Sequence, residues 1–183
     1  PFAEPAEAEK GRVISWNQVM PSVEGEYPRV SMRYIPMPCM HCDHPPCVQV
    51  CPVEATYKNP EGIVAQIYNR CIGCRYCTVA CPYTRRFFNW YGPSWPEQRS
   101  WTEQDQTHRV MDQHLNPEVS VRPKGVVEKC MFCTQRLREV QERSRKEKRA
   151  IRDEEVVRLP ACCQTCPSEA RYFGDLDDPT STV

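Results

Sequence analysis

The sequence lacks a long hydrophobic run and an excess of charge of either sign. No apolar stretch among its 183 residues approaches the roughly 18 that cross a bilayer, so we expect no membrane-spanning helix. Lysine and arginine together number 24, as do aspartate and glutamate, and this balance disfavours a nucleic-acid partner and an acidic tail. An initiator methionine and a signal-like apolar segment are also lacking, which predicts a processed or truncated chain.

Hydrophobic residues make up only 40% of the chain, but cysteine is abundant, with 13 residues. In a secreted protein this many cysteines would suggest disulfides. Here their clustered spacing, with a proline after several of them, favours metal ligation instead. Bound metal can replace part of a hydrophobic core, because the free energy of metal binding becomes free energy of folding.

Eight of the cysteines form two runs that each end in Cys-Pro. The first run, C-x2-C-x4-C-x3-C-P, comprises Cys39, Cys42, Cys47 and Cys51. The second, C-x2-C-x2-C-x3-C-P, comprises Cys71, Cys74, Cys77 and Cys81. The second spacing is that of bacterial ferredoxins, in which the fourth cysteine binds the other cluster of a pair. We therefore predict two [4Fe-4S] clusters with exchanged fourth ligands, held by Cys39, Cys42, Cys47 and Cys81 and by Cys71, Cys74, Cys77 and Cys51.

Other metal sites fit these runs less well. Zinc takes four ligands, typically as two separated pairs, whereas each run offers four cysteines in succession. A Rieske centre needs two histidine ligands, and no C-x2-H follows the C-x-H of Cys39 and His41. His41 and His44 are therefore interpreted as supporting or surface residues. The proline after each fourth cysteine predicts short helices at residues 52–57 and 82–86.

The pattern predicts an α+β fold of tandem bacterial-ferredoxin-like, two-cluster modules with long loops and an inserted charged helix. We expect an N-terminal segment that is the truncated remainder of a ferredoxin-like half (1–38), a two-cluster module (39–86), an aromatic and polar insert (87–129) and a second ferredoxin-like half (130–183). Strands are predicted at 12–19, 30–35 and 63–68, a turn at 59–62 and a solvated helix at 136–152.

The insert opens with a group of aromatic residues that either form a local core or dock a partner. They are Phe87, Phe88, Trp90, Tyr91, Trp95 and Trp101. Residues 97–117 are polar and are predicted to form a loop.

A third cysteine group comprises Cys130, Cys133, Cys162, Cys163 and Cys166. Residues 166–172 (CPSEARY) match residues 51–57 (CPVEATY) at five of seven positions, so Cys166 is interpreted as a closing cysteine like Cys51. By the same comparison Cys130, Cys133 and Cys162 are partial ligands of a third cluster, Cys166 is a ligand of a fourth, and Cys163 is surplus. These clusters, [4Fe-4S] or [3Fe-4S], need a partner run, which we expect upstream or on another chain. Alternatively, Cys130, Cys133, Cys163 and Cys166 form a zinc site.

Several segments between about residues 28 and 180 together resemble a known family. They read CMHCDHPPCVQVCPVEATYK, EGIV, NRCIGCRYCTVACPY, VRPKGVVEKCMFCTQRL, PACCQTCP and FGDLDDP. The sequence resembles the electron-transfer subunit of complex iron–sulfur molybdoenzymes, such as dimethyl sulfoxide, polysulfide and tetrathionate reductases. It is most similar in character to the iron–sulfur subunit of quinone reductase complex and alternative complex III. It departs from the family by lacking the first of four cysteine groups and by a long insert between Cys133 and Cys162.

This resemblance implies an electron-transfer subunit with no substrate site of its own. It would join a molybdopterin-type large subunit, or another donor or acceptor such as cytochrome c, to an integral-membrane quinone-interacting subunit of a respiratory chain. We expect it as a peripheral subunit on the periplasmic side of the membrane. The alternatives are a soluble polyferredoxin shuttle and a zinc-stapled interaction module, while a radical enzyme would need an iron with an open position. Positive charge at Arg75, Lys124 and Lys129 either favours reduced clusters or simply faces water.

Overall fold

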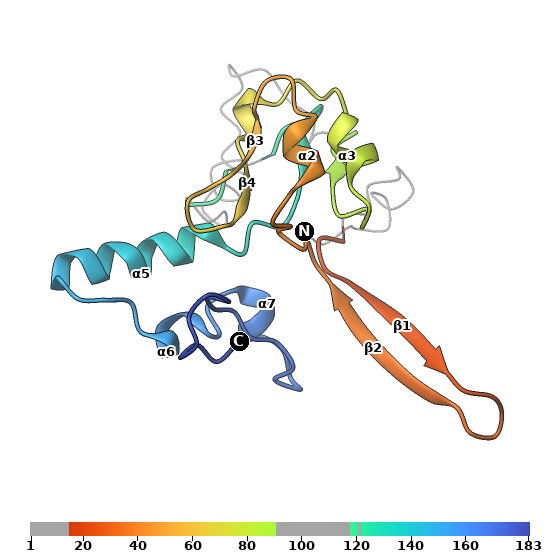
Figure 1. Cartoon of the computed structure of the whole chain (residues 1–183). Coiled ribbons are helices and arrows are strands. Elements are labelled where there is room, and N and C mark those ends of the chain that lie inside the picture. The colour runs from red at the N-terminus through yellow and green to blue at the C-terminus, as the bar shows by residue number, and fades with distance from the viewer. Residues whose placement is uncertain (1–14, 91–117, 121) are drawn as a thin grey trace, which may run out of the picture. The chain divides into compact units, whose positions relative to one another are not determined.

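The structure, a computed structural model, describes residues 15–90, 118–120 and 122–183 in two compact units (Figure 1). The first unit is Pro1–Met131 and the second is Phe132–Val183. Short helices and two-stranded sheets alternate along the chain, in agreement with the predicted α+β class. Over the described ranges, no helix has the length and apolar character needed to cross a bilayer.

The first element is a β-hairpin that pairs β1 (Gln18–Glu24) with β2 (Ser31–Met37) in antiparallel register. The predicted strand at 30–35 is present, but it continues to Met37 through Pro36. This is tolerated because Pro36 and Pro21 lie two register positions apart, and every second pair of an antiparallel ladder lacks backbone hydrogen bonds. The predicted strand at 12–19 begins outside the described residues and overlaps β1 at Gln18 and Val19 only.

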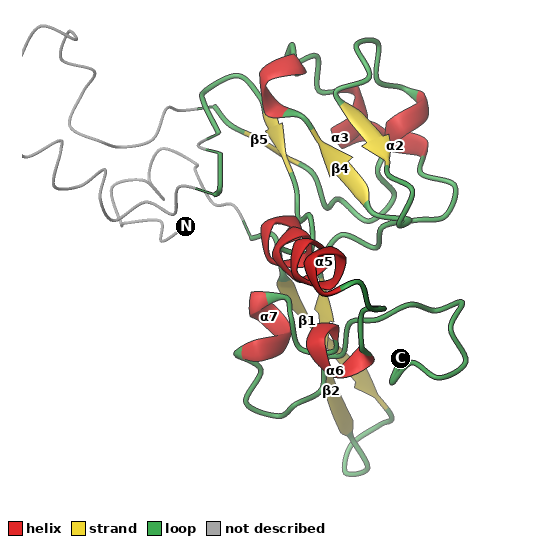
Figure 2. Ribbon diagram, turned by 90° about the vertical axis from the view of Figure 1, so that its left-hand side faces the viewer, coloured by secondary structure: helices red, strands yellow, loops and turns green. Residues whose placement is uncertain are grey.

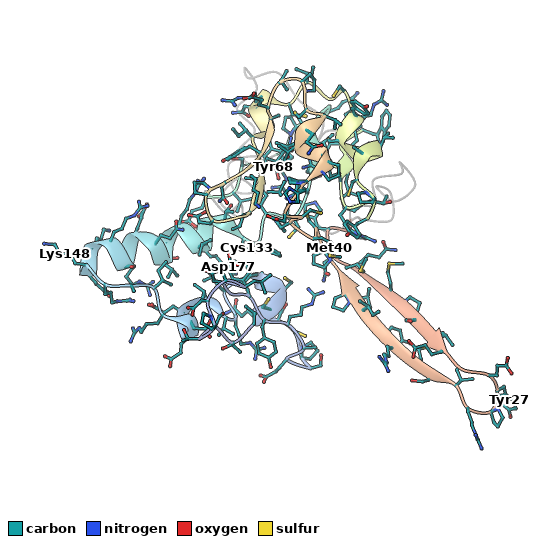
Figure 3. All side chains as sticks on the ribbon, viewed as in Figure 1. Tyr27, Met40, Tyr68, Cys133, Lys148 and Asp177 are labelled. Carbon is teal, nitrogen blue, oxygen red and sulfur yellow. The ribbon has the colours of Figure 1, made fainter. Side chains whose placement is uncertain are left out.

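The hairpin does not bury an apolar face within the described chain. Met37 at the end of β2 is partly buried, but eight other large apolar side chains are each more than 40% exposed: Val19, Met20, Val23, Tyr27, Val30, Met32, Tyr34 and Ile35. Figure 3 labels Tyr27 at the hairpin tip, where 92% of the residue is exposed.

The two cysteine runs lie on short elements of the first unit. The first run is followed by the hairpin of β3 (Thr56–Lys58) and β4 (Val64–Gln66), whose turn hydrogen bonds Gly62 N to Asn59 O at 3.0 Å. The second run follows the 3-10 helix η1 (Tyr68–Arg70), and β5 (Phe87–Phe88) then pairs with β6 (Val127–Glu128). The predicted turn at 59–62 and a strand after it are thus confirmed, although β4 is shorter than the predicted strand.

Cysteine side chains form part of the hydrophobic core. Cys47 and Cys77 are buried together with Val64 and Val127, and Phe88 packs against this group. The core therefore joins both cysteine runs to strands β4 and β6.

The short helices lie before the closing cysteines and not after them, so the prediction of helices at 52–57 and 82–86 is wrong. The observed helices are α2 (Pro46–Gln49), α3 (Tyr76–Ala80) and, in the second unit, α7 (Ala161–Gln164). A helix cannot continue after the closing cysteine because the third residue beyond it has a positive φ, 50° at Glu54 and 53° at Thr84.

The predicted charged helix is confirmed in the second unit as α5 (Thr134–Glu147), which is visible end-on in Figure 2. Leu137, Val140 and Ser144 form its buried stripe. The helix ends at Lys148, whose φ of 49° allows Arg149 N to donate to Ser144 O. A shorter helix, α6 (Asp153–Val156), follows.

The described part of the aromatic stretch forms a small cluster. The rings of Phe88 and Trp90 meet edge-to-face at 4.6 Å, and the Arg75 guanidinium lies 4.9 Å from the Trp90 ring centroid. Trp90 nevertheless remains 53% exposed, so the choice between a local core and a docking surface stays a prediction. Tyr91, Trp95, Trp101 and the polar segment 97–117 lie outside the described residues.

A glycine contact in the second cysteine run generates a stability prediction. Gly73 has a φ of +71°, and a β-carbon there would collide with the carbonyl oxygen of Gly125 and lie 3.1 Å from the Phe88 ring. Gly125 has a φ of +90°, but a β-carbon on it would meet nothing within 4 Å. Gly73→Ala should therefore cost more than Gly125→Ala, which carries only the backbone penalty of about 1–2 kcal/mol.

The measurement is the midpoint of thermal unfolding of the two variants. About 1 kcal/mol lowers this midpoint by roughly 2–4 °C in a chain of this size. The Gly73→Ala midpoint should lie several degrees below that of Gly125→Ala, and equal midpoints would contradict the close packing of the two loops.

Candidate functional site

The three C-x2-C loops share one backbone feature. The third residue of each loop has a positive φ, 45° at His41, 71° at Gly73 and 51° at Phe132. A residue with positive φ next to residues with negative φ can turn successive backbone N–H groups toward one side of the loop. These N–H groups then form a concave site for an anion. Each loop therefore suits an anionic group held by its two cysteines.

The three closing Cys-Pro segments form the same turn. The N–H three residues beyond the cysteine donates to the cysteine carbonyl at 3.2–3.3 Å, in the pairs Glu54–Cys51, Thr84–Cys81 and Glu169–Cys166. The next N–H donates to the cysteine sulfur, from Ala55 to Cys51 Sγ at 3.2 Å and from Arg85 to Cys81 Sγ at 3.4 Å. At Cys166 a hydrogen bond from the Ala170 backbone also lowers the pKa of the thiol, after the larger effect of the Ser168 hydroxyl. All three turns thus stabilise negative charge on the closing sulfur.

The second unit repeats the helix that precedes this turn. Val48 N donates to Pro45 O at 3.0 Å in α2, and Cys163 N donates to Pro160 O at 2.9 Å in α7. By this backbone match Cys162 occupies the place of Cys47, and Cys163 occupies that of Val48.

The two neighbouring cysteines of α7, Cys162 and Cys163, differ in burial. Cys163 is only 5% exposed, and burial raises the pKa of its thiol to about 11, with further increases from Cys162 and Cys133. Cys162 is partly exposed, and Cys133 Sγ accepts a hydrogen bond from Ala161 N at 3.4 Å. The backbone therefore matches Cys162 to a ligand position, while the buried thiol is that of Cys163.

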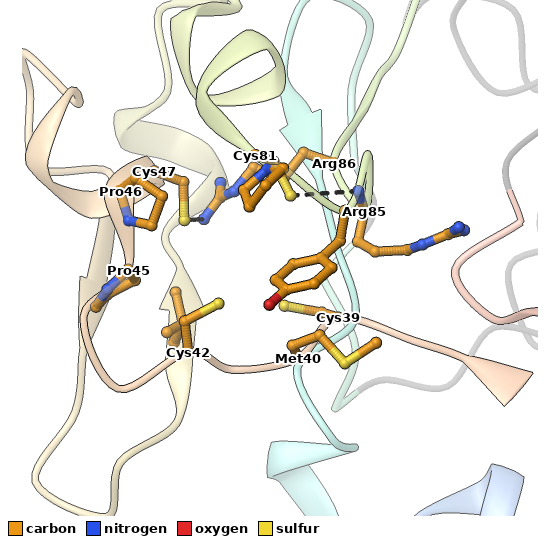
Figure 4. A pocket seen from close by; sticks show the side chains of 12 residues that line it. Cys39, Met40, Cys42, Pro45, Pro46, Cys47, Cys81, Arg85 and Arg86 are labelled. Atoms are coloured by element: carbon orange, nitrogen blue, oxygen red, sulfur yellow. Dashed lines mark hydrogen bonds between the residues drawn. The ribbon is translucent and has the colours of Figure 1, made fainter.

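One pocket of the first unit is lined by cysteines from both runs (Figure 4). Cys39, Cys42 and Cys47 come from the first run, and Cys81 comes from the second. Burial raises the pKa of the Cys42 thiol, and the other three thiols raise it further because they lie close to it. The chain thus brings the closing cysteine of the second run to the first three cysteines of the first run.

Two cysteines of the second predicted set adjoin a cysteine of this pocket, because Cys77 is buried in one cluster with Cys47 and Cys71 packs against that cluster. Burial raises the pKa of the Cys77 thiol, the nearby Arg86 guanidinium opposes this increase, and Cys71 adds to it. Cys71 Sγ accepts a hydrogen bond from Val127 N at 3.5 Å. Cys74 is exposed, and Cys51 is partly exposed in its closing turn.

Two buried cations adjoin these thiols. Arg86 is 4% exposed and donates from Nη2 to Cys47 Sγ at 3.1 Å. Lys129 is 0% exposed, and its Nζ donates to Val64 O and to Cys130 O at 2.7 Å. Burial lowers the pKa of this ammonium group, and the nearby Cys39 thiol opposes the decrease. The interpretation that Lys129 faces water is therefore wrong, whereas Lys124 is exposed. In the described part of the chain, no carboxylate pairs with Arg86 or Lys129.

The two histidines of the first run have different surroundings. His41 Nδ1 accepts a hydrogen bond from Val64 N at 3.1 Å. Burial lowers the pKa of His41 to about 2, with smaller effects from Lys129 and Arg86, so the ring is neutral at ordinary pH. His41 therefore supports the first loop, while His44 is exposed beside Asp43.

These surroundings fit an iron–sulfur cluster. A cluster bound by four thiolates is an anion, and the site provides backbone N–H donors and buried cations that have no carboxylate partner among the described residues. Arg86 was not predicted to belong to the site, whereas Lys129 was named from the sequence as a charge that either favours reduced clusters or faces water.

Comparisons with known proteins agree with this chemistry. The family described as "4Fe-4S dicluster domain" matches residues 30–97. The chain is 44% identical to the iron–sulfur cluster-binding subunit of menaquinone reductase from Nitratidesulfovibrio vulgaris, over 98% of this chain and 67% of that protein. It is 40% identical to a putative iron–sulfur subunit of dimethyl sulfoxide reductase from Halobacterium salinarum, over 92% of this chain and 57% of that protein.

A third relative is the arsenate respiratory reductase iron–sulfur subunit of Shewanella sp., 36% identical over 93% of this chain and 72% of that protein. The chain thus spans 57–72% of the length of these three relatives.

Proposed function

Because the chain belongs to the family of iron–sulfur subunits of quinone reductase and molybdoenzyme complexes, we propose that it conducts electrons between two partner subunits. One partner is a molybdopterin-type large subunit, or another donor or acceptor such as cytochrome c. The other is an integral-membrane subunit that reacts with quinone. The chain would lie as a peripheral subunit on the periplasmic side of the membrane.

The observation that carries this proposal is the pocket lined by cysteines of both runs. We assign one [4Fe-4S] cluster to Cys39, Cys42, Cys47 and Cys81 and a second to Cys71, Cys74, Cys77 and Cys51. A [4Fe-4S] cluster takes up and releases one electron at a time, with a potential set by net charge, hydrogen bonds and exposure. Four thiols at the pocket leave no iron open for substrate, which argues against a radical enzyme.

The chain's own residues would prepare these sites for electron transfer. The N–H groups of Ala55 and Arg85 hold the closing sulfurs in place, and Lys129 holds positive charge beside Cys39 and Cys130. That charge would stabilise the reduced, more negative state. Lys129 thus favours electron uptake at the first cluster.

The third cysteine group is proposed as two incomplete clusters. Cys130, Cys133 and Cys162 would serve one cluster, Cys166 would serve another, and a run outside this sequence would complete both. The turns at Cys51 and Cys166 have the same backbone hydrogen bond, which supports two incomplete clusters over a zinc site. The unmatched length of the relatives leaves room for such a run.

Ligand exchange is tested by a matched pair of variants. Cys81→Ala should abolish or alter the electron paramagnetic resonance signal of the cluster held by Cys39, Cys42 and Cys47. Cys51→Ala should instead change the signal of the cluster held by Cys71, Cys74 and Cys77. If each variant damages the cluster of its own run, the exchanged assignment is wrong.

The surplus cysteine is tested by iron analysis of the full protein. Cys163→Ala should leave the iron content unchanged, because Cys163 takes the backbone place of Val48. Cys162→Ala should lower the iron content. The opposite pattern, together with bound zinc, would favour closure by Cys163 and Cys166.

The electron-transfer role is tested on protein purified from native membranes. The chain should copurify with an integral-membrane subunit and a large subunit without crosslinking, since permanent interfaces commonly bury more than about 2,000 Å². A reduced quinone analogue or a large-subunit substrate should then change the redox state of the clusters in the complex only. Recovery as a free soluble monomer, in both low and high salt, would instead favour a soluble shuttle.

A further inference from the structure

We propose that Arg86 is a shared counter-cation for the two clusters and raises both of their reduction potentials together. This inference rests on the ligand sets of the proposed function. The Arg86 guanidinium donates to Cys47 Sγ at 3.1 Å, and Cys47 belongs to the first set. Cys77 belongs to the second set and is buried in the same side-chain cluster as Cys47. The nearby Arg86 charge opposes the burial that raises the pKa of the Cys77 thiol, and it also lowers the pKa of the Cys51 thiol.

The β3–β4 hairpin, which follows the first cysteine run, holds the Arg86 guanidinium in position. Nη1 donates to Gln66 Oε1 at 3.0 Å, and Nη2 donates to Thr56 Oγ1 at 2.6 Å. Thr56 is itself fixed, because its hydroxyl donates to Ala65 O at 3.0 Å. The planar guanidinium therefore has little freedom to move away from either thiol.

The charge of Arg86 is permanent, because a guanidinium is not deprotonated in proteins. It is also buried, and its hydrogen-bond partners within the described residues are a hydroxyl, an amide and the Cys47 thiol. Burying an ion without an opposite charge is unfavourable. Two anionic clusters on either side would supply the missing negative charge.

The charge of Arg86 would also affect the reduction potentials of the clusters. Reduction adds one negative charge to a cluster, and a nearby fixed cation stabilises the reduced form. Since one cation adjoins ligands of both sets, its removal should lower both potentials, not one. A shared cation thus raises both potentials together and leaves the difference between them unchanged.

A purely structural role of Arg86 is the competing explanation, because its guanidinium also hydrogen bonds residues of both β3 and β4. Two variants distinguish the structural role from the electrostatic role. Arg86→Gln removes the charge, whereas Arg86→Lys keeps the charge but loses the forked geometry.

Arg85 offers a matched control on the neighbouring residue. It is 5% exposed, and its guanidinium donates to Gln18 Oε1 at 2.8 Å and contacts Met20 Sδ at 3.7 Å, while only its backbone N–H meets a thiol. Arg85→Gln removes an equal charge close to the first pocket but away from the second set.

The experiment is a redox titration of the iron-loaded full chain, followed by electron paramagnetic resonance. Arg86→Gln should shift the reduction equilibrium of both clusters toward the oxidised form by about tenfold, or 59 mV for one electron. Arg86→Lys should shift both by much less, and Arg85→Gln should leave the second cluster unchanged. Unchanged potentials in Arg86→Gln with full iron content, or a shift of only one cluster, would overturn the inference.

Iron analysis decides the remaining outcomes. Iron lost from Arg86→Gln but retained by Arg86→Lys would show that the clusters require the charge, and would support the inference. Iron lost from both variants would assign Arg86 a structural role and overturn it. Failure of the ligand sets is detected separately, by the Cys81→Ala and Cys51→Ala signals in a chain that retains Arg86.

Discussion

The hydrogen bond from Arg86 Nη2 to Cys47 Sγ, 3.1 Å long, joins a buried cation to a thiol of the hydrophobic core. The guanidinium is not stable there alone, because an unpaired buried charge carries a large desolvation cost. Lys129, with no exposed surface, poses the same problem beside Cys39. Thiolates that bind an anionic cluster balance both cations, so the charge of the site and the packing of the core depend on each other.

The regular elements that surround the cysteine runs of the first unit are too short to fold by their own contacts. Strands β3 and β4 have three residues each, and β5 and β6 have two each. Cys47 and Cys77 contribute to the same core as Val64 and Val127. Cluster binding therefore supplies free energy of folding that short strands cannot provide. This also explains why a chain with 40% hydrophobic residues forms compact units.

The sequence predicted the features that depend on local spacing. The turn at 59–62, the charged helix α5 and the repeat of the Cys-Pro segments were all readable from short motifs. The helices predicted after Pro52 and Pro82 were wrong because proline also opens tight turns, and the positive φ at Glu54 and Thr84 is not encoded by glycine. Burial of Arg86 and Lys129 could not be read from the sequence either, since basic residues are usually exposed and only the tertiary structure brings them to the thiols.

The turn that follows each closing cysteine also occurs in the second unit, at Cys166. At Cys81 the turn presents the sulfur to a pocket formed by a different run, and its N–H donor stabilises negative charge there. Cys166 has the same turn and the same kind of donor, so its sulfur is equally prepared for a ligand role. The geometry of one turn therefore supports the expectation that residues outside this sequence complete the last two clusters.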